Sequence, residues 1–140
     1  MKIGNPIQIL NPYDWLPGFG ESKVCFYSAE LDVIVDISYE RAGAGADETL
    51  LVRRKLRFKN VSHFLKLPFP AIDFFQFAGD ASEFALGALT EFRRSDLLSL
   101  GGVSFESGRI KHFSIQFLSE NLSLHVIAED VSLSEELSLQ

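Results

Sequence analysis

Residues 109–131 read RIKHFSIQFLSENLSLHVIAEDV and carry the clearest structural signal of the chain. Apolar and polar side chains alternate on both sides of Ser119-Glu120-Asn121, which is the pattern of two half-buried strands joined by a turn. A two-residue loop at Glu120-Asn121 predicts that Phe117 faces Leu124 across the hairpin. Because a shift by one residue would exchange the apolar and polar faces, this register is favoured.

The same register fixes which polar side chains meet on the other face of the hairpin. His112 lies opposite Glu129 there, and Gln116 lies opposite His125. Because a carboxylate across from an imidazole favours the imidazolium form, we expect the pKa of His112 to lie above the ordinary value of about 6.5. We expect water on this face, and His112 and Glu129 are candidate binding residues. A buried pair of these two side chains would instead favour an enzyme.

A second hairpin is predicted on either side of the small-residue loop 41–47. Apolar side chains occupy nearly every odd position from Cys25 to Tyr39, and a break near residues 28–30 divides this stretch into two strands. Pairing Tyr39 with Leu50 brings apolar residues together on one face. On the other face it joins opposite charges, which stabilise a sheet by about 0.2–1 kcal/mol per pair. These pairs are Asp36 with Arg53 and Asp32 with Arg57.

Prolines and glycines interrupt residues 1–20, so this segment is expected to be largely irregular. Residues 7–10 can form a short edge strand before the next proline. Trp15 is expected to cover one end of a sheet, because a lone tryptophan is usually in or near the core. The alternative is an exposed aromatic residue that recognises a partner.

Two short helices are predicted near the end of the chain. Ser95 is the expected N-cap of the first, which ends at the glycines 101–102. The spacing of Ser132 and Glu135 is typical of a capping box and predicts a final helix, with a frayed end as the alternative. Residues 84–92 are interpreted as a strand, with a helix as the rival.

These signals together predict a mainly β protein at the margin of the α+β class. We expect an antiparallel curved sheet or partly closed barrel built from hairpins, with one or two short helices. The strands are predicted at residues 23–28, 31–40, 49–60, 84–92, 109–118 and 122–131.

Composition limits the classes of protein that this chain can belong to. Its 140 residues, 46% hydrophobic and with 13 phenylalanines, predict one folded domain over residues 1–140. A net charge of −6 disfavours nucleic acid and anionic membranes as partners and suits a basic protein partner. The one cysteine, Cys25, allows no internal disulfide. Without a spanning apolar run or a signal-peptide pattern, the chain is expected to be cytoplasmic.

Five phenylalanines lie in the segment 64–77, where two prolines favour an extended crossover. Phe69, Phe74 and Phe75 are candidate binding residues, because an exposed cluster would form an interface; covering the sheet is the alternative. Arg54 interrupts an otherwise apolar strand face. It either extends to water near a sheet edge or lies in a cavity, directed at an anion.

Catalytic and metal-binding patterns are weak. A hydrolase could be drawn from Ser114, His125 or His112, and Glu129, but no oxyanion hole or nucleophile elbow accompanies these residues. Zinc would need three or four converging ligands, and glycine pairs lack the context of a phosphate-binding loop. We therefore expect no cofactor, no metal and no enzymatic activity.

Several short segments resemble small uncharacterised bacterial domains, some of which are encoded beside polymorphic toxins and act as immunity proteins. The likeness covers about half the chain and rests on general strand patterns. It supplies no catalytic residues, and it implies a stoichiometric binder. The segments are Leu56-Arg57-Phe58-x-Asn60-Val61, Leu86-Gly87-Ala88-Leu89-x-Glu91, Ser95-Asp96, Lys111-His112-Phe113 and Val126-Ile127-Ala128-Glu129.

The sequence therefore favours a non-enzymatic protein-binding module, such as an immunity-type inhibitor of a basic toxin. The alternative is a carrier of small ligands, whose curved sheet encloses an apolar cavity with Arg54 at its mouth. Self-association of the chain stays open in both cases.

Overall fold

The computed structural model describes residues 1–17, 22–45, 47–69, 74–99 and 109–138. Its strands form two sheets, with a single α-helix in the described part, α1 (Asp96–Ser99). A six-stranded sheet has the order β5-β9-β8-β7-β1-β6, and a five-stranded sheet has the order β10-β4-β3-β2 with β11 also paired to β4. The strands are β1 (Lys2–Leu10), β2 (Lys23–Ala29), β3 (Asp32–Ala42), β4 (Thr49–Lys59), β5 (His63–Pro68), β6 (Gln76–Phe77), β7 (Leu89–Ser95), β8 (Lys111–Phe117), β9 (Leu122–Ala128), β10 (Asp130–Leu133) and β11 (Leu137–Ser138).

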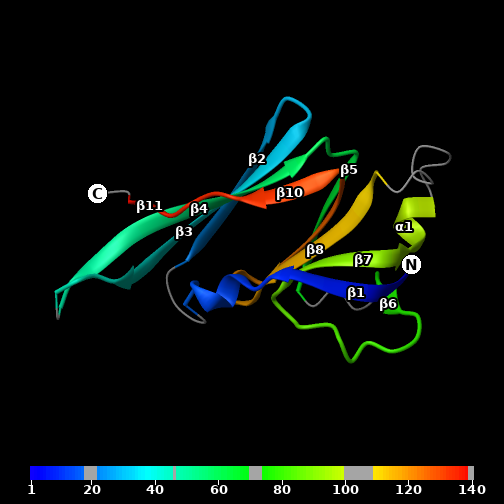
Figure 1. Cartoon of the computed structure of the whole chain (residues 1–140), viewed down its shortest axis with the longest axis horizontal. Coiled ribbons are helices and arrows are strands. Elements are labelled where there is room, and N and C mark those ends of the chain that lie inside the picture. The colour runs from blue at the N-terminus through cyan, green and yellow to red at the C-terminus, as the bar shows by residue number, and fades with distance from the viewer. Residues whose placement is uncertain (18–21, 46, 70–73, 100–108, 139–140) are drawn as a thin grey trace.

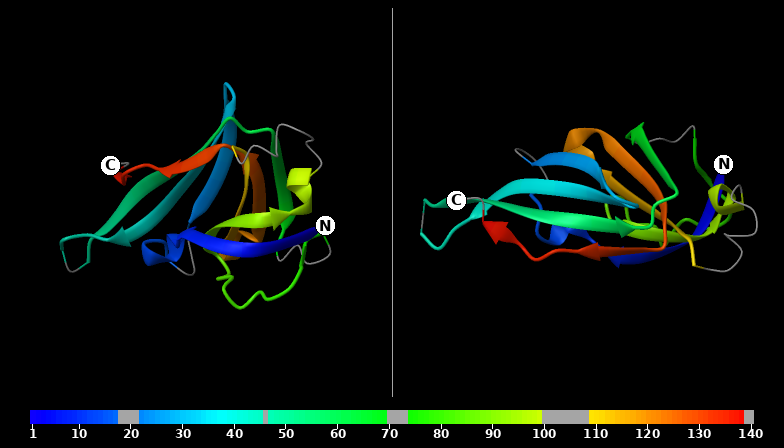
Figure 2. Two further views of the ribbon diagram at one scale, coloured as in Figure 1. Left: turned by 45° about the vertical axis from the view of Figure 1, so that its right-hand side comes forward. Right: turned by 90° about the horizontal axis from the view of Figure 1, so that it is seen from above.

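The prediction of a mainly β protein with a curved, antiparallel sheet is confirmed. Strand pairs are antiparallel except for the short parallel pair of β1 with β6. The six-stranded sheet curls, while the long β3–β4 hairpin of the other sheet extends away from it (Figures 1 and 2). In the described part of the chain, no helix is long and apolar enough to cross a membrane.

The predicted β8–β9 hairpin forms, but its register differs from the prediction by two residues. Phe117 pairs with Leu122, and His112 pairs with Ile127. The connection is longer than a two-residue loop, because Leu118–Glu120 forms a 3-10 turn and Asn121 adopts a left-handed conformation with φ of 52°. A shift of two residues leaves every side chain on its predicted face but changes all of its partners.

The β3–β4 hairpin shows the same kind of shift. Tyr39 pairs with Val52 instead of Leu50. Both predicted ion pairs nevertheless form, as diagonal contacts of 3.4 Å between Asp36 and Arg53 and 2.6 Å between Asp32 and Arg57. The long arginine side chains reach their carboxylates from the neighbouring position of the ladder.

Three predicted segments are wrong. Residues 2–10 form the long strand β1 between β7 and β6, instead of an irregular segment with a short edge strand. The strand expected at residues 84–92 begins only at Leu89, because Gly87 takes a positive φ of 88° and residues 84–88 form turns. The helix expected from Ser132 is absent. Instead β10 and β11 hydrogen-bond to the edge of β4, where Ser134 Oγ accepts the Lys55 backbone N–H. An open sheet edge thus pairs with a tail too short to form a stable helix by itself.

Other expected elements are found where they were predicted. The strands at 23–28, 31–40 and 49–60 correspond to β2, β3 and β4, and 109–118 and 122–131 contain β8 and β9. Ser95 Oγ accepts the backbone N–H of Leu97 at 3.2 Å, which supports the start of α1. The predicted end of this helix at 101–102 lies outside the described residues.

The central strands β8 and β9 of the six-stranded sheet are buried on both faces. One face packs on the five-stranded sheet through Phe113, Ile115 and Phe117, each at most 1% exposed. The opposite face holds a second cluster around Ile3, Phe75 and Phe92, enclosed where the sheet curls. All seven residues of β9 are consequently buried. The second face was expected to be wet, and its burial creates the candidate site.

Candidate functional site

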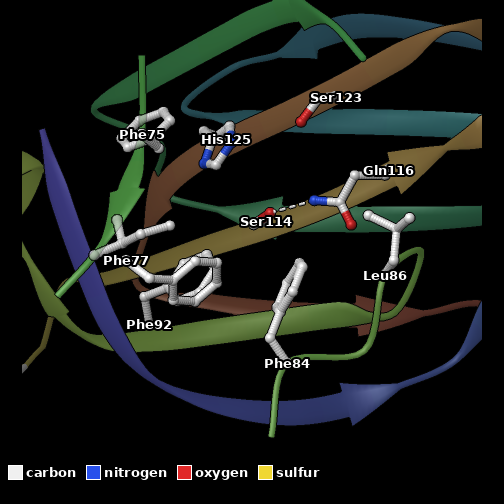
Figure 3. Close-up of a pocket in the computed structure, with 10 residues that line it drawn as sticks. Phe75, Phe77, Phe84, Leu86, Phe92, Ser114, Gln116, Ser123 and His125 are labelled. Atoms are coloured by element: carbon white, nitrogen blue, oxygen red, sulfur yellow. Dashed lines mark hydrogen bonds between the residues drawn. The ribbon is translucent and has the colours of Figure 1, made fainter. Parts of the chain in front are cut away.

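A cavity of about 180 Å³ lies on the enclosed face of the six-stranded sheet. We call it the inner cavity. Figure 3 shows the polar side chains of β8 and β9, with Phe75 beside His125 and with Phe77, Phe84 and Phe92 across from them. Leu86, which is 53% exposed, places the cavity close to the protein surface. The lining residues are Ile3, Phe75, Phe77, Phe84, Leu86, Phe92, Ser114, Gln116, Ser123 and His125.

Four buried polar side chains form the floor of the cavity: Ser114, Gln116, Ser123 and His125. They alternate with core residues because successive side chains of a strand point to opposite faces. Ser114 pairs directly with His125, and Gln116 pairs with Ser123. Directly opposed residues have Cβ atoms about 4.5–5.5 Å apart, so two neighbouring floor side chains can contact one small molecule.

A pair of buried histidines connects the floor to α1. His125 Nδ1 lies 2.8 Å from His112 Nε2, and His112 Nδ1 lies 2.6 Å from Ser95 Oγ. Phe75 stacks on the His125 ring with 4.0 Å between ring centroids. Packing against Phe75 and Phe92 therefore holds both rings, and each fixes the other by a hydrogen bond.

Both histidines are held in the neutral form. Burial and, to a smaller extent, the nearby His125 together lower the pKa of His112 to about 3. Burial also lowers the pKa of His125 to about 4. The cavity floor therefore carries no positive charge near neutral pH.

Gln116 is fixed by hydrogen bonds at both ends of its amide. Its Oε1 accepts the backbone N–H of Gly87 at 3.0 Å, and its Nε2 donates to Ser114 Oγ at 2.7 Å. Gly87 can make this contact because a positive φ of 88° turns its backbone toward β8. The loop that follows Phe84 is thereby attached to the cavity floor.

Replacing Gly87 by alanine is expected to lower the free energy of unfolding by about 1–3 kcal/mol, because it adds both backbone strain and a clash. A Cβ at this position would lie 2.8 Å from Tyr13 Cε2. Gly79→Ala is the matched control, since its φ is 92° but no atom lies within 4 Å of the added Cβ. Urea unfolding should show the larger loss for Gly87→Ala. Equal losses would mean that Tyr13 moves aside without cost.

The candidate residues of the phenylalanine-rich crossover separate in the structure. Phe75 is buried and lines the inner cavity, whereas Phe74 is 39% exposed and touches Phe75 edge to face. Phe69 is half-buried, and its backbone N–H donates to the carbonyl of Asn121. In this crossover, Phe75 thus covers the sheet, whereas Phe74 remains partly exposed to solvent.

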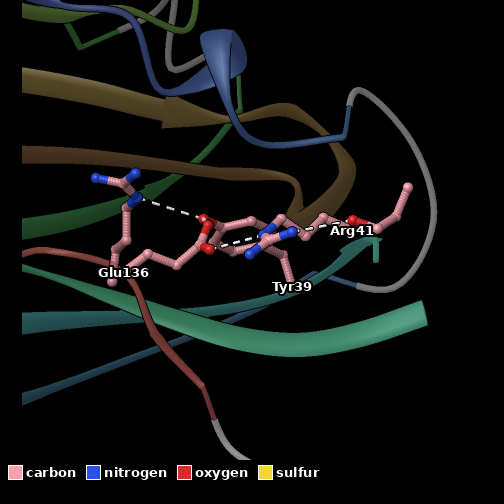
Figure 4. A network of polar contacts seen from close by, with 5 residues as sticks. Tyr39, Arg41 and Glu136 are labelled. Carbon is pink, nitrogen blue, oxygen red and sulfur yellow. Dashed lines mark hydrogen bonds and ion pairs between the residues drawn. The ribbon is translucent and has the colours of Figure 1, made fainter. Parts of the chain in front are cut away.

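Trp15 and Arg54 meet at the other end of the molecule, away from the inner cavity. The Arg54 guanidinium lies 5.0 Å from the centre of the Trp15 ring, and Trp15 packs on Tyr39. Figure 4 shows the polar network of Tyr39, which donates to Glu136 at 2.5 Å, while Arg41 pairs with the same carboxylate. Arg54 Nε donates to the Tyr39 hydroxyl at 3.3 Å.

These contacts assign a structural part to both residues. Burial, followed by the hydrogen bond to Glu136, raises the pKa of Tyr39, and the hydrogen bond from Tyr39 lowers the pKa of Glu136. Arg54 lies over the Trp15 ring and is not among the residues that line the inner cavity. The expectation that it stands at the mouth of a ligand cavity does not hold for this cavity.

The predicted pair of His112 with Glu129 is wrong. Glu129 forms an ion pair with Arg109, whose hydrogen bond lowers the pKa of Glu129. His112 is fully buried against His125, so its pKa falls instead of rising. The four-residue connection between the strands explains the lost pair, because it moves Glu129 beyond the end of the ladder, whereas burial explains the lowered pKa of His112.

A Ser-His-Glu hydrolase arrangement does not form either. Ser114 accepts a hydrogen bond from Gln116, and Glu129 contacts neither histidine. No group of three or more potential metal ligands among His, Cys, Asp and Glu occurs in the described residues. The arrangement can bind an uncharged molecule by packing and hydrogen bonding.

Sequence reasoning missed most of the cavity wall. Phe77 of β6, Phe92 of β7 and Ile3 of β1 line it together with Phe84 of the connection between β6 and β7. The available signal was the number of phenylalanines, which exceeds what one core face needs. No protein-family model, curated protein or solved structure matches the chain significantly.

Proposed function

We propose that this protein binds a small, uncharged and mainly apolar molecule in the inner cavity. The observation that carries the proposal is the contrast between the phenylalanine wall and the four polar side chains of the floor. Small-molecule sites typically combine an apolar lining with a few polar groups that orient the ligand. This proposal is a form of the small-ligand carrier that was predicted from the sequence as an alternative, but its site is the inner cavity and does not include Arg54.

The size of the cavity restricts the ligand. An engineered cavity of about 150 Å³ is enough to bind benzene. At about 180 Å³, the inner cavity has room for a single ring with a short substituent. A charged ligand is disfavoured, since none of the described residues that line the cavity is charged and a buried charge needs a partner.

Ethylbenzene is expected to bind the wild-type protein and to shift the amide NMR signals of β8, β9 and residues 75–92. Ser123→Phe, which adds a ring inside the cavity, should abolish these shifts. The matched control is Ser38→Phe, which fills a separate open groove lined by Ser22, Lys23, Glu40 and Leu51. Ethylbenzene shifts that persist in Ser123→Phe, or that never arise in the wild type, would refute the proposal.

Protein binding is a second candidate, favoured by the free edge of β2. This strand ends the five-stranded sheet and exposes Phe26 and Tyr27, and Leu31 in the adjoining turn is 70% exposed. Unpaired sheet edges accept an extended strand from a partner. An immunity-type inhibitor of a basic, bacterial toxin remains one form of this proposal, supported by the net charge of −6. Both candidates assume a cytoplasmic protein.

A binding assay with the purified product of the adjacent gene tests this second candidate. Tyr27→Lys should weaken the complex with a basic partner by placing a positive charge on the β2 edge. Leu137→Lys is the matched control on β11, since Leu137 is also exposed but lies at the opposite edge of the same sheet. Equal weakening by both variants would exclude the β2 edge, and the absence of any complex would exclude this partner.

A further inference from the structure

The hydrogen bonds behind the cavity floor have a direction that can be traced. Two chains of hydrogen bonds start at backbone N–H groups, which can only donate, and both end at the inner cavity. Because a backbone N–H never accepts, each chain constrains the donors and acceptors that follow it. The two chains of hydrogen bonds therefore determine whether the cavity presents donors or acceptors to a ligand.

The shorter chain runs from Gly87 through Gln116 to Ser114. The Gly87 N–H occupies Gln116 Oε1, so the amide NH₂ of Gln116 donates to Ser114 Oγ. Ser114 therefore accepts from Gln116 and keeps its own proton. No other described residue accepts that proton, and Ser114 lines the inner cavity. This chain ends in a hydroxyl donor.

The longer chain runs from Leu97 through Ser95 and His112 to His125. The Leu97 N–H donates to Ser95 Oγ, and the Ser95 proton finds an acceptor at His112 Nδ1, 2.6 Å away. His112 then carries its proton on Nε2 and donates to His125 Nδ1 at 2.8 Å. His125 is left with a protonated Nε2.

The opposite direction of this chain is less favourable. If His112 Nδ1 donated to Ser95 Oγ, the Ser95 hydroxyl proton would have no acceptor among the described residues. Leaving the hydroxyl donor of the half-buried Ser95 without a protein acceptor costs part of a hydrogen bond. No described residue hydrogen-bonds His125 Nε2, so this N–H is free for a ligand in the cavity.

We propose that the inner cavity selects an uncharged carbonyl compound, whose oxygen accepts from His125 Nε2 and Ser114 Oγ while its apolar body contacts the phenylalanines. This inference rests on the proposed binding function. A carbonyl oxygen has two lone pairs and no proton, which matches two converging donors. Ser114 and His125 are direct cross-strand partners, so one oxygen can lie between them.

Two other head groups fit less well. An alcohol can accept from both donors, but its own proton would then need a further acceptor, either the Ser123 hydroxyl or the second lone pair of Gln116 Oε1. A carboxylate would accept well but would bring a negative charge beside two neutral histidines. The preferred order is therefore ketone or aldehyde, then alcohol, with carboxylate last.

The test is calorimetric titration of the full-length chain near neutral pH with four probes of similar size: ethylbenzene, acetophenone, 1-phenylethanol and benzoate. Acetophenone is expected to bind about tenfold or more tighter than ethylbenzene, because it makes two additional hydrogen bonds to buried side chains. 1-Phenylethanol should fall between them, and benzoate should show no heat of binding.

Any other order of the four affinities contradicts either the carbonyl preference or the proposed binding function. Equal affinity for acetophenone and ethylbenzene, or tighter binding of 1-phenylethanol or benzoate, would overturn the carbonyl preference and leave the proposed binding function intact. If neither ethylbenzene nor acetophenone binds, the proposed function falls, and the carbonyl preference falls with it.

A variant outside the cavity tests the longer chain without altering the wall. Ser95→Ala removes the donor to His112 Nδ1, so the two histidines can reverse their direction and His125 can become an acceptor. The preference for acetophenone over 1-phenylethanol should then fall several-fold. Ser99→Ala is the matched control, because Ser99 lies in the same short helix and donates only to the Asp96 carbonyl.

A spectroscopic measurement keeps this test valid if Ser95→Ala folds poorly. The ring ¹⁵N signals of His125 in the wild-type protein distinguish a protonated Nε2 from a bare one. We expect a protonated Nε2 that shifts when acetophenone is added. A bare Nε2 in the free protein would refute the assigned direction.

Discussion

Acidification from about pH 7.5 to about pH 5 is expected to lower the free energy of unfolding by about 4 kcal/mol. The cause is the buried pair His112 and His125, whose pKa values of about 3 and about 4 lie well below the ordinary value. Below about pH 6.5 the unfolded chain takes up protons that the folded protein does not. Each histidine then lowers stability by about 1.4 kcal/mol per pH unit.

The sign follows from the direction of the shifts. Because both folded-state pKa values are lowered, the two imidazoles contribute no penalty above about pH 6.5, where both states are neutral. Stability falls as the pH drops from there and levels off near pH 4 for His125 and near pH 3 for His112. Carboxylates with lowered pKa values add to the loss only below about pH 4.5. These are Asp32, Asp80, Glu129 and Glu136.

Urea unfolding at several pH values between about 7.5 and 5 measures the effect. The matched variant is His125→Gln, which keeps a hydrogen-bonding group beside His112 and should reduce the dependence on pH by about half. The wild-type curve should be steepest below about pH 6.5. A flat curve across this interval would show that the imidazoles take up protons in the folded protein.

From the sequence one can assign each side chain to a face of its strand, but not to its cross-strand partner. Alternation in β8 and β9 assigns each side chain to a face correctly, because the strand period of two is a local property. The register depends on the length of the connection. A 3-10 turn at Leu118–Glu120 followed by a left-handed Asn121 leaves no distinct pattern in the chain.

The predicted ion pairs form even though the predicted register of the β3–β4 hairpin is wrong. The ion pairs of Arg53 with Asp36 and Arg57 with Asp32 form in a ladder that is displaced by two residues. An arginine side chain is long enough to reach a diagonal neighbour. Agreement between charge and apolar patterns therefore supports a hairpin without fixing its alignment.

The inner cavity could not be predicted, because local patterns do not reveal whether a polar sheet face is wet. Ser114, Gln116 and His125 have the composition of a solvated face, and all are buried. Their burial depends on the curl of the six-stranded sheet and on Phe75 and Phe92, which lie far from them in the sequence. The excess of phenylalanine was the one general indication of a second core.

Replacing Phe113 by alanine is expected to lower the free energy of unfolding by about 3–5 kcal/mol. Phe113 is 1% exposed on the face between the two sheets, where its ring centre lies 5.9 Å from that of Phe58 on β4. Truncation removes this contact and leaves a cavity that the surrounding side chains fill only in part. Phe26→Ala is the control, because Phe26 is already 38% exposed and touches only the margin of the core. Its loss should be about 1 kcal/mol.

A double-mutant cycle with Phe58→Ala tests whether the contact between the sheets is the cause. If the two rings stabilise the protein through each other, the double variant should lose less than the sum of the single losses, by about 0.5–1.5 kcal/mol. Additive losses would mean that each ring acts through its own neighbours. A loss below about 1 kcal/mol for Phe113→Ala alone would contradict the packing of the two sheets on each other, since a tightly packed interior cannot lose a phenyl ring at so small a cost.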